Sequence, residues 1–365
     1  MRPVEGGGSV FHADILTAEG PARRQPLAAG RRHSDVMGPT RHRLLAVFVA
    51  LGALLLVAGV LGHQGRPTPV AAGAGPTPPS PTSSAASGDH AAYVVVARPP
   101  IAVRPELPGG GYQVFGHHRF LVAYYGTAQT ASMGVLGRTD PDTMQRHLMN
   151  AARPFREPGE QIQPVYELIV TVADAAPGLD GDYSHDIPAS YVHEYLRAAH
   201  RHHALLLLDL QTGRADFPSV ARRWAWALKD PSVGLALDPE WRMGPHQVPA
   251  HVIGSVSAAE VNRTSAWLSG LVRRNGLPQK LFVLHEFRLT MLPDIQRVVH
   301  RPGLAMVQHA DGFGTRGQKL ATYHAITRPA RFRQGFKLFY HWDVHRFGPR
   351  EVRRIRPRVS FVSYQ

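Results

Sequence analysis

Short apolar runs recur along the part of the chain that begins near residue 93. None is longer than nine residues, and each is apolar at consecutive positions, as strands buried on both faces of a parallel sheet are. Segments long enough for a helix separate neighbouring runs. The pattern therefore predicts strands alternating with helices, with strands at Phe120–Tyr125, Val165–Ala173, Ala204–Leu210, Val233–Asp238, Leu281–Phe287, Leu304–His309, Phe336–His341 and Val359–Tyr364.

The clearest predicted helix, Ser257–Asn275, lies between the fourth and fifth strands. Ser257 and Glu260 have the spacing of a capping box, in which each side chain satisfies the other residue's backbone N–H. Gly276 and Pro278 follow the last apolar position of the helix and are expected to end it. Glu260 is therefore interpreted as a capping residue.

Eight such strands in about 270 residues match an α/β fold, the closed (β/α)8 barrel of TIM type, whose usual length is about 250 residues. The alternative is an open, doubly wound sheet. No Gly-rich phosphate loop follows any predicted strand, which counts against a nucleotide-binding sheet. We expect residues 93–365 to form one barrel domain, with an additional strand at Tyr93–Ala97 at its bottom, and we expect no cofactor.

An uninterrupted apolar segment, Leu44–Gly62, precedes this domain. As a helix its 19 residues would be about 28 Å long, close to the roughly 30 Å hydrocarbon thickness of a bilayer. Arg31, Arg32, Arg41 and Arg43 precede the segment, which places the N-terminus inside and the barrel outside. The sequence predicts a single transmembrane helix that anchors the protein in the cell membrane, or a secreted protein if the segment is cleaved.

The segments on either side of this helix have compositions typical of disorder. Residues 1–43 are rich in Gly, Arg and Pro, and residues 63–92 in Pro, Ser, Thr, Gly and Ala, so neither can bury much apolar surface. We expect a disordered cytoplasmic N-terminus and a disordered tether. The chain has no cysteine, which excludes disulfides, thiolate metal sites, cysteine nucleophiles and a lipid-modified cysteine anchor.

The chain is basic, with a formal net charge of +14, but its basic residues do not predict nucleic-acid binding. Lysine supplies only four of the 41 basic residues, and the arginines are scattered among acidic residues apart from Arg353–Arg358. We expect no specific nucleic-acid partner. A basic surface facing an anionic cell wall or lipid headgroups fits an exported protein better.

Carboxylates follow the fourth predicted strand, VGLALDPEW. Side chains alternate faces along a strand, so Gly234, Ala236, Asp238 and Glu240 share one face, opposite Val233, Leu235 and Leu237. Small residues that lead to two acids suit a barrel interior and its mouth, where TIM barrels carry their active sites. Two neighbouring carboxylates raise each other's pKa, as a general acid at neutral pH requires. Alternatively, Asp238-Pro239-Glu240 simply begins a helix or turn.

The motif Asp238-Pro239-Glu240 resembles the D-x-E after the fourth strand of chitinase-like and muramidase-like glycoside hydrolase barrels. The resemblance implies Glu240 as the proton donor and Asp238 as its supporting group. It departs from the chitinase pattern at Gly234 and Ala236, where further aspartates are absent. The strings YYGT, DGDYS and LALDPEW also resemble a family of exported bacterial barrel proteins with no established activity.

Glycoside hydrolysis ordinarily needs a second carboxylate. Glu286, after the fifth predicted strand, and Asp343, after the seventh, are the candidates, although only one of His285 and Glu286 can face inward. Polar and aromatic residues at the same ends of other strands are candidate substrate-binding groups: Tyr125, Asp209, Trp241, His309, Trp342 and Tyr364.

Metal-dependent hydrolysis is a competing interpretation, because histidines also end several strands. It predicts that His285, His309 and Asp343 converge within ligand distance. The pattern resembles part of an amidohydrolase barrel, but the H-x-H on the first strand and the aspartate on the eighth that this family needs are missing. We therefore do not expect a metal site.

Together these patterns predict a membrane-anchored or secreted glycoside hydrolase-like barrel. Its partner would be a cell-wall or extracellular polysaccharide, and its chemistry carboxylate general acid and base catalysis. The alternative that needs no catalysis is a barrel that binds wall polymer with the same rim.

Overall fold

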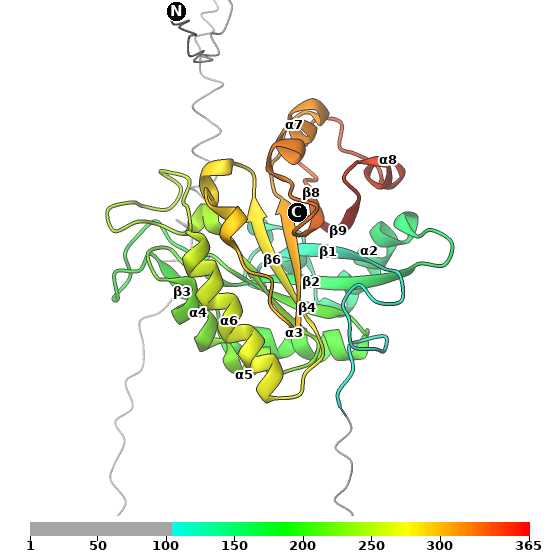
Figure 1. Cartoon of the computed structure of the whole chain (residues 1–365), viewed down its shortest axis with the longest axis horizontal. Helices are drawn as coiled ribbons and strands as arrows, with labels where there is room; N and C mark the ends of the chain where they lie inside the picture. The colour runs from blue at the N-terminus through cyan, green and yellow to red at the C-terminus, as the bar shows by residue number, and fades with distance from the viewer. Residues whose placement is uncertain (1–103) are drawn as a thin grey trace, which may run out of the picture. The chain divides into compact units, whose positions relative to one another are not determined.

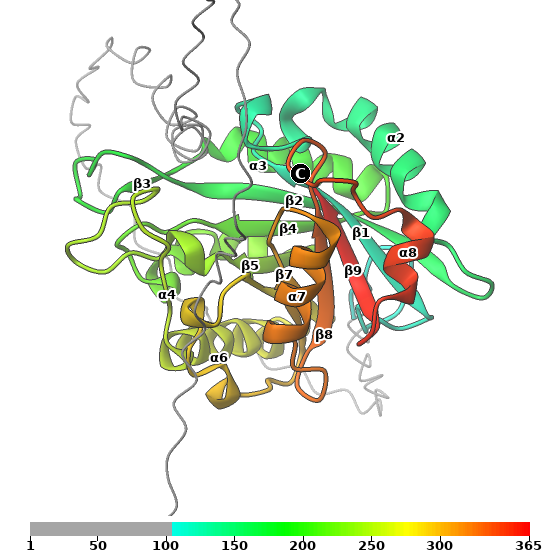
Figure 2. The same ribbon diagram turned by 90° about the horizontal axis from the view of Figure 1, so that it is seen from above.

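Residues 104–365 are described by the structure, a computed structural model, and they form a closed barrel of eight parallel strands (Figures 1 and 2). β1 pairs with β9 on one side and with β2 on the other, so the ring of eight parallel strands is closed. This confirms the TIM-like barrel and excludes the open sheet. The barrel strands are β1 (Arg119–Gly126), β2 (Gln161–Ala173), β4 (Leu205–Leu210), β5 (Val233–Leu237), β6 (Lys280–Glu286), β7 (Leu304–Ala310), β8 (Arg333–Leu338) and β9 (Val359–Tyr364).

Helices cover the outside of the barrel, and α4 and α6 lie side by side there (Figure 1). The connection from β6 to β7 departs from the regular alternation, because it contains the 3-10 helices η5 (Leu289–Met291) and η6 (Ile295–Arg297) in place of an α-helix. A short strand, β3 (Ser184–Asp186), pairs antiparallel with the end of β2. The α-helices are α2 (Pro141–Ala152), α3 (Ala189–Arg201), α4 (Phe217–Arg223), α5 (Ala225–Leu228), α6 (Ala258–Arg274), α7 (Arg316–Ile326) and α8 (Pro349–Arg354).

Four further 3-10 helices lie in the connections: η1 (Ala131–Met133), η2 (Leu136–Arg138), η3 (Arg153–Phe155) and η4 (Pro239–Trp241). The last of these is the most relevant to function. It directly follows β5 and carries Glu240, so the motif that ends the fourth barrel strand lies at the carboxyl end of the barrel.

The alternation predicted for the fourth barrel strand is confirmed. Leu235 and Leu237 pack in the layer between barrel and helices, whereas Ala236 belongs to the apolar cluster inside the barrel. Gly234 also faces inward, and a Cβ there would lie 2.5 Å from the carbonyl oxygen of Leu281. The glycine therefore lets β5 approach β6 closely, and the inward face continues to Asp238.

The seventh barrel strand is displaced from its prediction. The apolar pattern predicts Phe336–His341, whereas β8 spans Arg333–Leu338. The strand starts in polar residues because Gly335 packs closely against His309. A Cβ added at residue 335 would lie only 2.5 Å from the ring carbon Cδ2 of His309. It ends early because the backbone N–H of Phe339 donates to Asp343 at 3.0 Å. His341, Trp342 and Asp343 consequently lie in a loop beyond the strand.

The helix after β5 agrees with its prediction at the N-cap but not in the full capping box. Ser257 accepts from the backbone N–H of Glu260 at 3.3 Å, as predicted. The Glu260 carboxylate turns away from the helix end, accepts from the N–H of Phe217 at 2.9 Å and pairs with Arg242 at 2.9 Å. The side chain thus ties α6 to the start of α4 and to the loop after η4.

The segment before β1 closes the N-terminal end of the barrel. Leu107 and Val114 are buried, and with Phe115 they pack against the apolar cluster inside the barrel. The predicted strand Tyr93–Ala97, the apolar segment 44–62, the N-terminus 1–43 and the tether 63–92 lie outside the described residues. Among residues 104–365, no helix combines the length and apolar character needed to cross a membrane.

Candidate functional site

Ionisable and polar side chains form the last layer of the barrel interior at the carboxyl ends of the strands, and we call this set the polar layer. Each follows small or apolar inward-facing residues on its own strand, as Asp238 follows Ala236. None of these side chains is more than 7% exposed. Its members are Tyr125, Glu167, Asp209, Asp238, His285, His309, Asp311, Lys337 and Ser363.

His285 lies at the centre of the layer between two acids. Its Nε2 is 3.0 Å from Glu167 Oε1, and its Nδ1 is 3.0 Å from Asp311 Oδ2. Burial alone would lower the pKa of His285, but the bonds to Asp311 and Glu167 outweigh burial and raise the pKa well above its usual value. His285 is therefore a fixed cation that bridges two opposite sides of the barrel, β2 and the end of β7.

Lys337 is the second cation of the layer. Its Nζ lies 3.0 Å from both oxygens of Asp311 and 3.4 Å from the centre of the Tyr125 ring. Although burial raises the pKa of an acid, the charges of Lys337 and His285 prevail at Asp311 and hold its pKa below the usual range. Asp311 is therefore an anion held between two cations.

His309 neighbours His285, with ring centres 5.0 Å apart, but differs from it in charge. Its Nε2 shares a hydrogen bond of 3.1 Å with the hydroxyl of Ser363. Burial and the positive charge of His285 lower the pKa of His309 well below its usual value. His309 is a neutral imidazole inside the barrel.

Asp209 and Asp238 are buried carboxyl groups whose four side-chain oxygens have no hydrogen-bond partner among the described residues. They project from neighbouring strands, and Asp209 is 0% and Asp238 1% exposed. Burial, with the negative charge of Glu167, raises the pKa of Asp209 to about 6. Burial and the charges of Glu240 and Asp209 raise the pKa of Asp238 well above its usual value.

Glu240 lies at the rim of the layer and is only half-buried, so solvent reaches it. Burial, reinforced by the negative charge of Asp311, raises its pKa to about 7, while Lys337 and His285 partly oppose that shift. Glu240 is therefore partly accessible from solvent, and near neutral pH it still carries a proton part of the time. Trp241, which follows it in η4, is also half-buried.

The loop that carries Glu240 is anchored behind the site by Arg242. Its guanidinium pairs with Glu260 at 2.9 Å and donates to the carbonyl of Arg214 at 3.2 Å. Gly254 adds a backbone hydrogen bond of 2.7 Å to the carbonyl of Glu240 itself. These contacts restrain η4 from three directions and so fix where the Glu240 side chain begins.

The structure brings together only some of the residues predicted for the site. Asp238, Glu240, Tyr125, Asp209 and His309 all belong to the polar layer or its rim. Their predicted roles in catalysis and binding stay predictions, but their convergence is a property of the fold.

The two residues predicted to supply a second carboxylate lie elsewhere. Glu286 is on the outer face of β6, where it accepts from the Gln308 amide at 2.7 Å, and burial raises its pKa to about 7. Asp343 is buried beyond β8 and pairs with Lys319 at 2.9 Å. Lys319 also donates to the carbonyls of Gly312 and Lys337, so this pair joins three segments of the rim.

The remaining two predicted binding residues differ in exposure. Tyr364 is 4% exposed and stacks on Tyr340 outside the barrel, with ring centres 5.3 Å apart. Trp342 is 42% exposed and lies 5.9 Å from the ring of Phe313, which is itself 48% exposed. Trp342 and Phe313 come from the loops after β8 and β7, so they form an exposed aromatic pair on the carboxyl-end side of the barrel.

The metal interpretation required His285, His309 and Asp343 to converge. The two rings are close, but Asp343 pairs with Lys319. Within residues 104–365, no group of three or more His, Asp or Glu side chains is arranged to hold a metal ion.

The raised pKa of Asp209 predicts how stability depends on pH. Because the folded state holds this proton up to about pH 6, and an unfolded aspartate loses it near pH 4, folding is disfavoured as pH rises between these values. Asp209→Asn removes the titration, so we expect the variant to be about 1–3 kcal/mol more stable than the unaltered chain at pH 7.5 and similar at pH 4. Thermal unfolding at both pH values measures this.

The matched control is Asp180→Asn, the same chemical change at an exposed position, which should leave the unfolding temperature unchanged at both pH values. An Asp209→Asn variant that is less stable than the unaltered chain at pH 7.5 would contradict the idea that this carboxyl is buried at a cost to stability.

The fold and the polar layer define the chain as a TIM-like (β/α)8 barrel with buried ionisable groups at its carboxyl-end mouth. Neither a protein-family model nor a curated protein matches the sequence.

Proposed function

We propose that the barrel is a glycoside hydrolase-like enzyme in which Glu240 is the general acid. The proposal rests on one observation. Among the carboxyl groups of the polar layer and its rim, Glu240 is the half-buried one and has a pKa raised to about 7. A general acid works best with a pKa near the working pH, and a position at the end of a barrel strand is where such a group acts.

The cations of the polar layer fit this role after the proton has left. Glu240 would give its proton to the glycosidic oxygen as the bond to the leaving sugar breaks, while water or the second carboxylate bonds to the anomeric carbon, and Glu240 is left as a carboxylate. Lys337 and His285 lie close enough to lower the pKa of Glu240, so they stabilise this carboxylate. The charge of Asp311 acts in the opposite direction and favours the protonated state before reaction.

For the second carboxylate, which must be ionised to act as base or nucleophile, we propose Asp209 in preference to Glu286 and Asp343, because a pKa of about 6 leaves Asp209 ionised at neutral pH. Glu286 faces the helix layer, and Asp343 is paired with Lys319, whereas the oxygens of Asp238 and Asp209 are unpartnered among the described residues. Asp238, whose pKa is raised well above its usual value, keeps the supporting role beside Glu240. Asp209 is buried, so a substrate reaches it only if side chains at the rim move aside.

The substrate we propose is a cell-wall or extracellular polysaccharide. Exposed Phe313 and Trp342 offer aromatic faces on which sugar rings stack. The apolar segment 44–62 would hold the barrel at the outer side of the cell membrane, within reach of wall polymers.

A non-catalytic barrel that binds such a polymer is the second candidate. The burial of the polar layer favours it, because Asp209, Asp238 and His285 are closed to solvent and the charge of His285 is matched by Glu167 and Asp311. In this case the aromatic pair and the rim would bind polymer, and the polar layer would have no chemical role.

One experiment separates the two candidates. The full-length chain in a neutral detergent is incubated with a panel of polysaccharides and peptidoglycan, and new reducing ends and polymer binding are measured in parallel. The hydrolase is supported if the unaltered chain releases reducing ends and Glu240→Gln releases fewer. Binding of a polymer without release, unchanged in Glu240→Gln, supports the binding barrel.

A further inference from the structure

The N-terminal end of the barrel, opposite the polar layer, carries two adjoining hollows that we call the N-terminal groove. They have volumes of about 570 and 560 Å³ and share His300, Ala330 and Arg331. The residues that line them precede β1, β6, β7, β8 and β9 or begin these strands. The groove is therefore built from the loops that enter the barrel.

Arginine side chains line the groove. Arg297, Arg331, Arg333 and Arg358 border it together with the His300 ring, and no Asp or Glu among residues 104–365 lines either hollow. Arg331 and Arg333 are exposed, and neither pairs with a carboxylate of the described part of the chain. Arg358 is the partly neutralised member, because it pairs with Glu160 at 2.6 Å.

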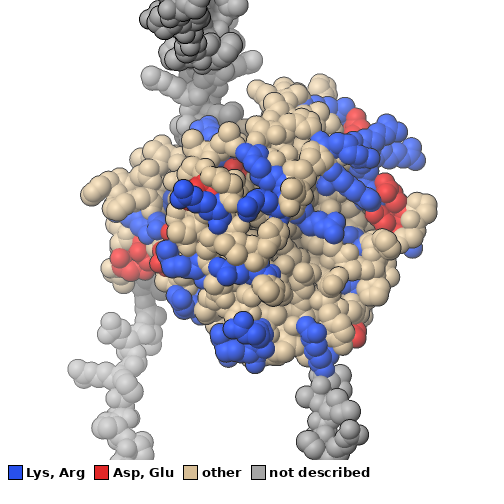
Figure 3. All heavy atoms as spheres, viewed as in Figure 1, with Lys and Arg blue, Asp and Glu red and all other residues tan. Residues whose placement is uncertain are grey.

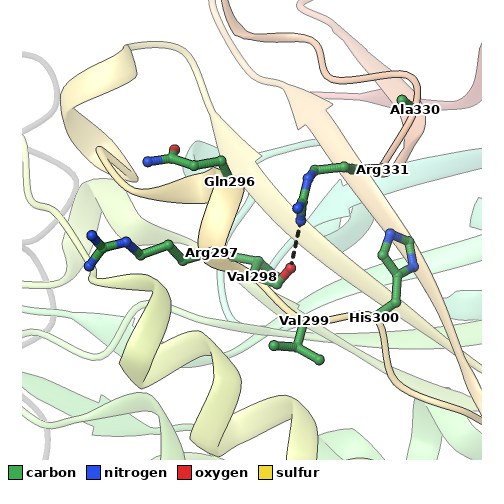
Figure 4. Close-up of a pocket in the computed structure, with 7 residues that line it drawn as sticks. All are labelled: Gln296, Arg297, Val298, Val299, His300, Ala330 and Arg331. Atoms are coloured by element: carbon green, nitrogen blue, oxygen red, sulfur yellow. Dashed lines mark hydrogen bonds between the residues drawn. The ribbon is translucent and has the colours of Figure 1, made fainter.

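The two unpaired arginines are held in place by contacts that leave their charge uncompensated. Arg331 Nη1 donates to the carbonyl of Val298 at 3.0 Å, with the His300 ring beside it (Figure 4). The Arg333 guanidinium lies 5.3 Å from the ring centre of Phe115. Arg297, by contrast, points away from this pair in Figure 4. A guanidinium oriented in advance loses less entropy when it binds an anion.

One face of the described domain is also predominantly basic. On the face shown in Figure 3, Lys and Arg side chains are spread far more widely than Asp and Glu. A surface of this kind attracts polyanions from a distance and concentrates them near the groove.

We propose that the N-terminal groove binds a phosphate-bearing polymer. One planar guanidinium group can donate two parallel hydrogen bonds to two oxygens of one phosphate. This geometry favours phosphate as the recognised group. Two hollows in contact, bordered by cations from the starts of several strands, fit a chain with repeated charges better than a single ion. The groove is separate from the polar layer, so this inference does not depend on the proposed hydrolase.

The test uses fluorescein-labelled inorganic polyphosphate as the probe and fluorescence anisotropy of the full-length chain in a neutral detergent. We expect Arg331→Gln/Arg333→Gln to raise Kd by about tenfold and to make binding less sensitive to salt, since two fewer counterions are released. Arg331→Lys/Arg333→Lys keeps the charge but loses the planar fork, so it should bind with intermediate affinity.

The matched control is Arg197→Gln/Arg263→Gln, which removes two exposed arginines from α3 and α6. It should change Kd by less than about twofold if the groove is the site. If the polymer were held only by nonspecific attraction to a basic surface, the control pair and the groove pair would raise Kd equally. Equal weakening by the two glutamine pairs, or no weakening by the groove pair, would overturn the proposal. So would competition by unlabelled hyaluronate, a carboxylate polymer, as strong as that by unlabelled polyphosphate.

Discussion

Glu240→Gln is expected to lower turnover of a cleaved polysaccharide at least tenfold, and by about 10²–10⁴-fold if general acid catalysis is fully lost. Glutamine has the same shape but no proton to give to the leaving oxygen. Because the protonated form of Glu240 is the active one and its pKa is about 7, kcat of the unaltered chain should also fall as pH rises through that value. Reducing-end assays between pH 5 and 9 measure both effects.

The control for this variant is Glu194→Gln, the same change on the exposed face of α3, which should leave turnover unaltered. Folding of Glu240→Gln should be intact, since the substitution removes a carboxyl group whose ionisation is disfavoured in the folded state. Full activity of Glu240→Gln on a confirmed substrate would remove Glu240 from the mechanism.

The positions of seven of the eight barrel strands could be predicted from the sequence, because each of these strands is buried along nearly all of its length and so forms an apolar run. The same signal failed for β8, which begins Arg333-Gln334-Gly335. There the local sequence is polar, and the strand is defined by long-range packing of Gly335 on His309. That contact leaves no apolar run in the local sequence, and the apolar residues lie at the end of the strand and after it.

That shift hid Lys337, the cation that holds Asp311. The argument applied to Gly234, Ala236 and Asp238, that small inward residues lead to a polar group at the mouth, applies equally to Gly335 and Lys337 once β8 is correctly placed. The sequence also marks Glu167 as unusual, since it is a lone acid within the apolar run Val165–Ala173. A charge in such a run has to be paired or functional, and Glu167 is paired with His285.

Sequence alone could not decide which of His285 and Glu286 faces inward. Alternation makes one of them inward, but the choice depends on the register of β6 against β7, which sets His285 opposite His309. Glu286 is a candidate second carboxylate by its chemistry, together with Asp343, whereas the barrel places His285 inside. A residue type that suits catalysis therefore says less than the face on which its neighbours lie.

Lys337→Met is expected to destabilise the barrel by about 3–5 kcal/mol at pH 7.5, because it leaves Asp311 as a buried charge that has lost one of its two cations. For a domain of this size the loss corresponds to a fall in unfolding temperature of about 10 °C. Thermal unfolding of the full-length chain, followed by tryptophan fluorescence, measures it. Methionine fills most of the lysine volume, so the effect should report charge more than packing.

Two further measurements separate charge from packing. Lys337→Met/Asp311→Asn removes both charges of the pair, so it should be more stable than Lys337→Met alone. If the two substitutions acted independently, the second would add to the loss of stability caused by the first. Without Lys337, the pKa of Asp311 should rise, since that cation is what chiefly holds it low. The folded variant then takes up a proton on acidification that an unfolded chain takes up less readily, and the defect should shrink as pH falls from 7.5 to 5. A double variant less stable than the single one, or a defect that is independent of pH, would show that Lys337 stabilises the barrel by packing on Tyr125 and that the polar layer is not a balanced set of charges.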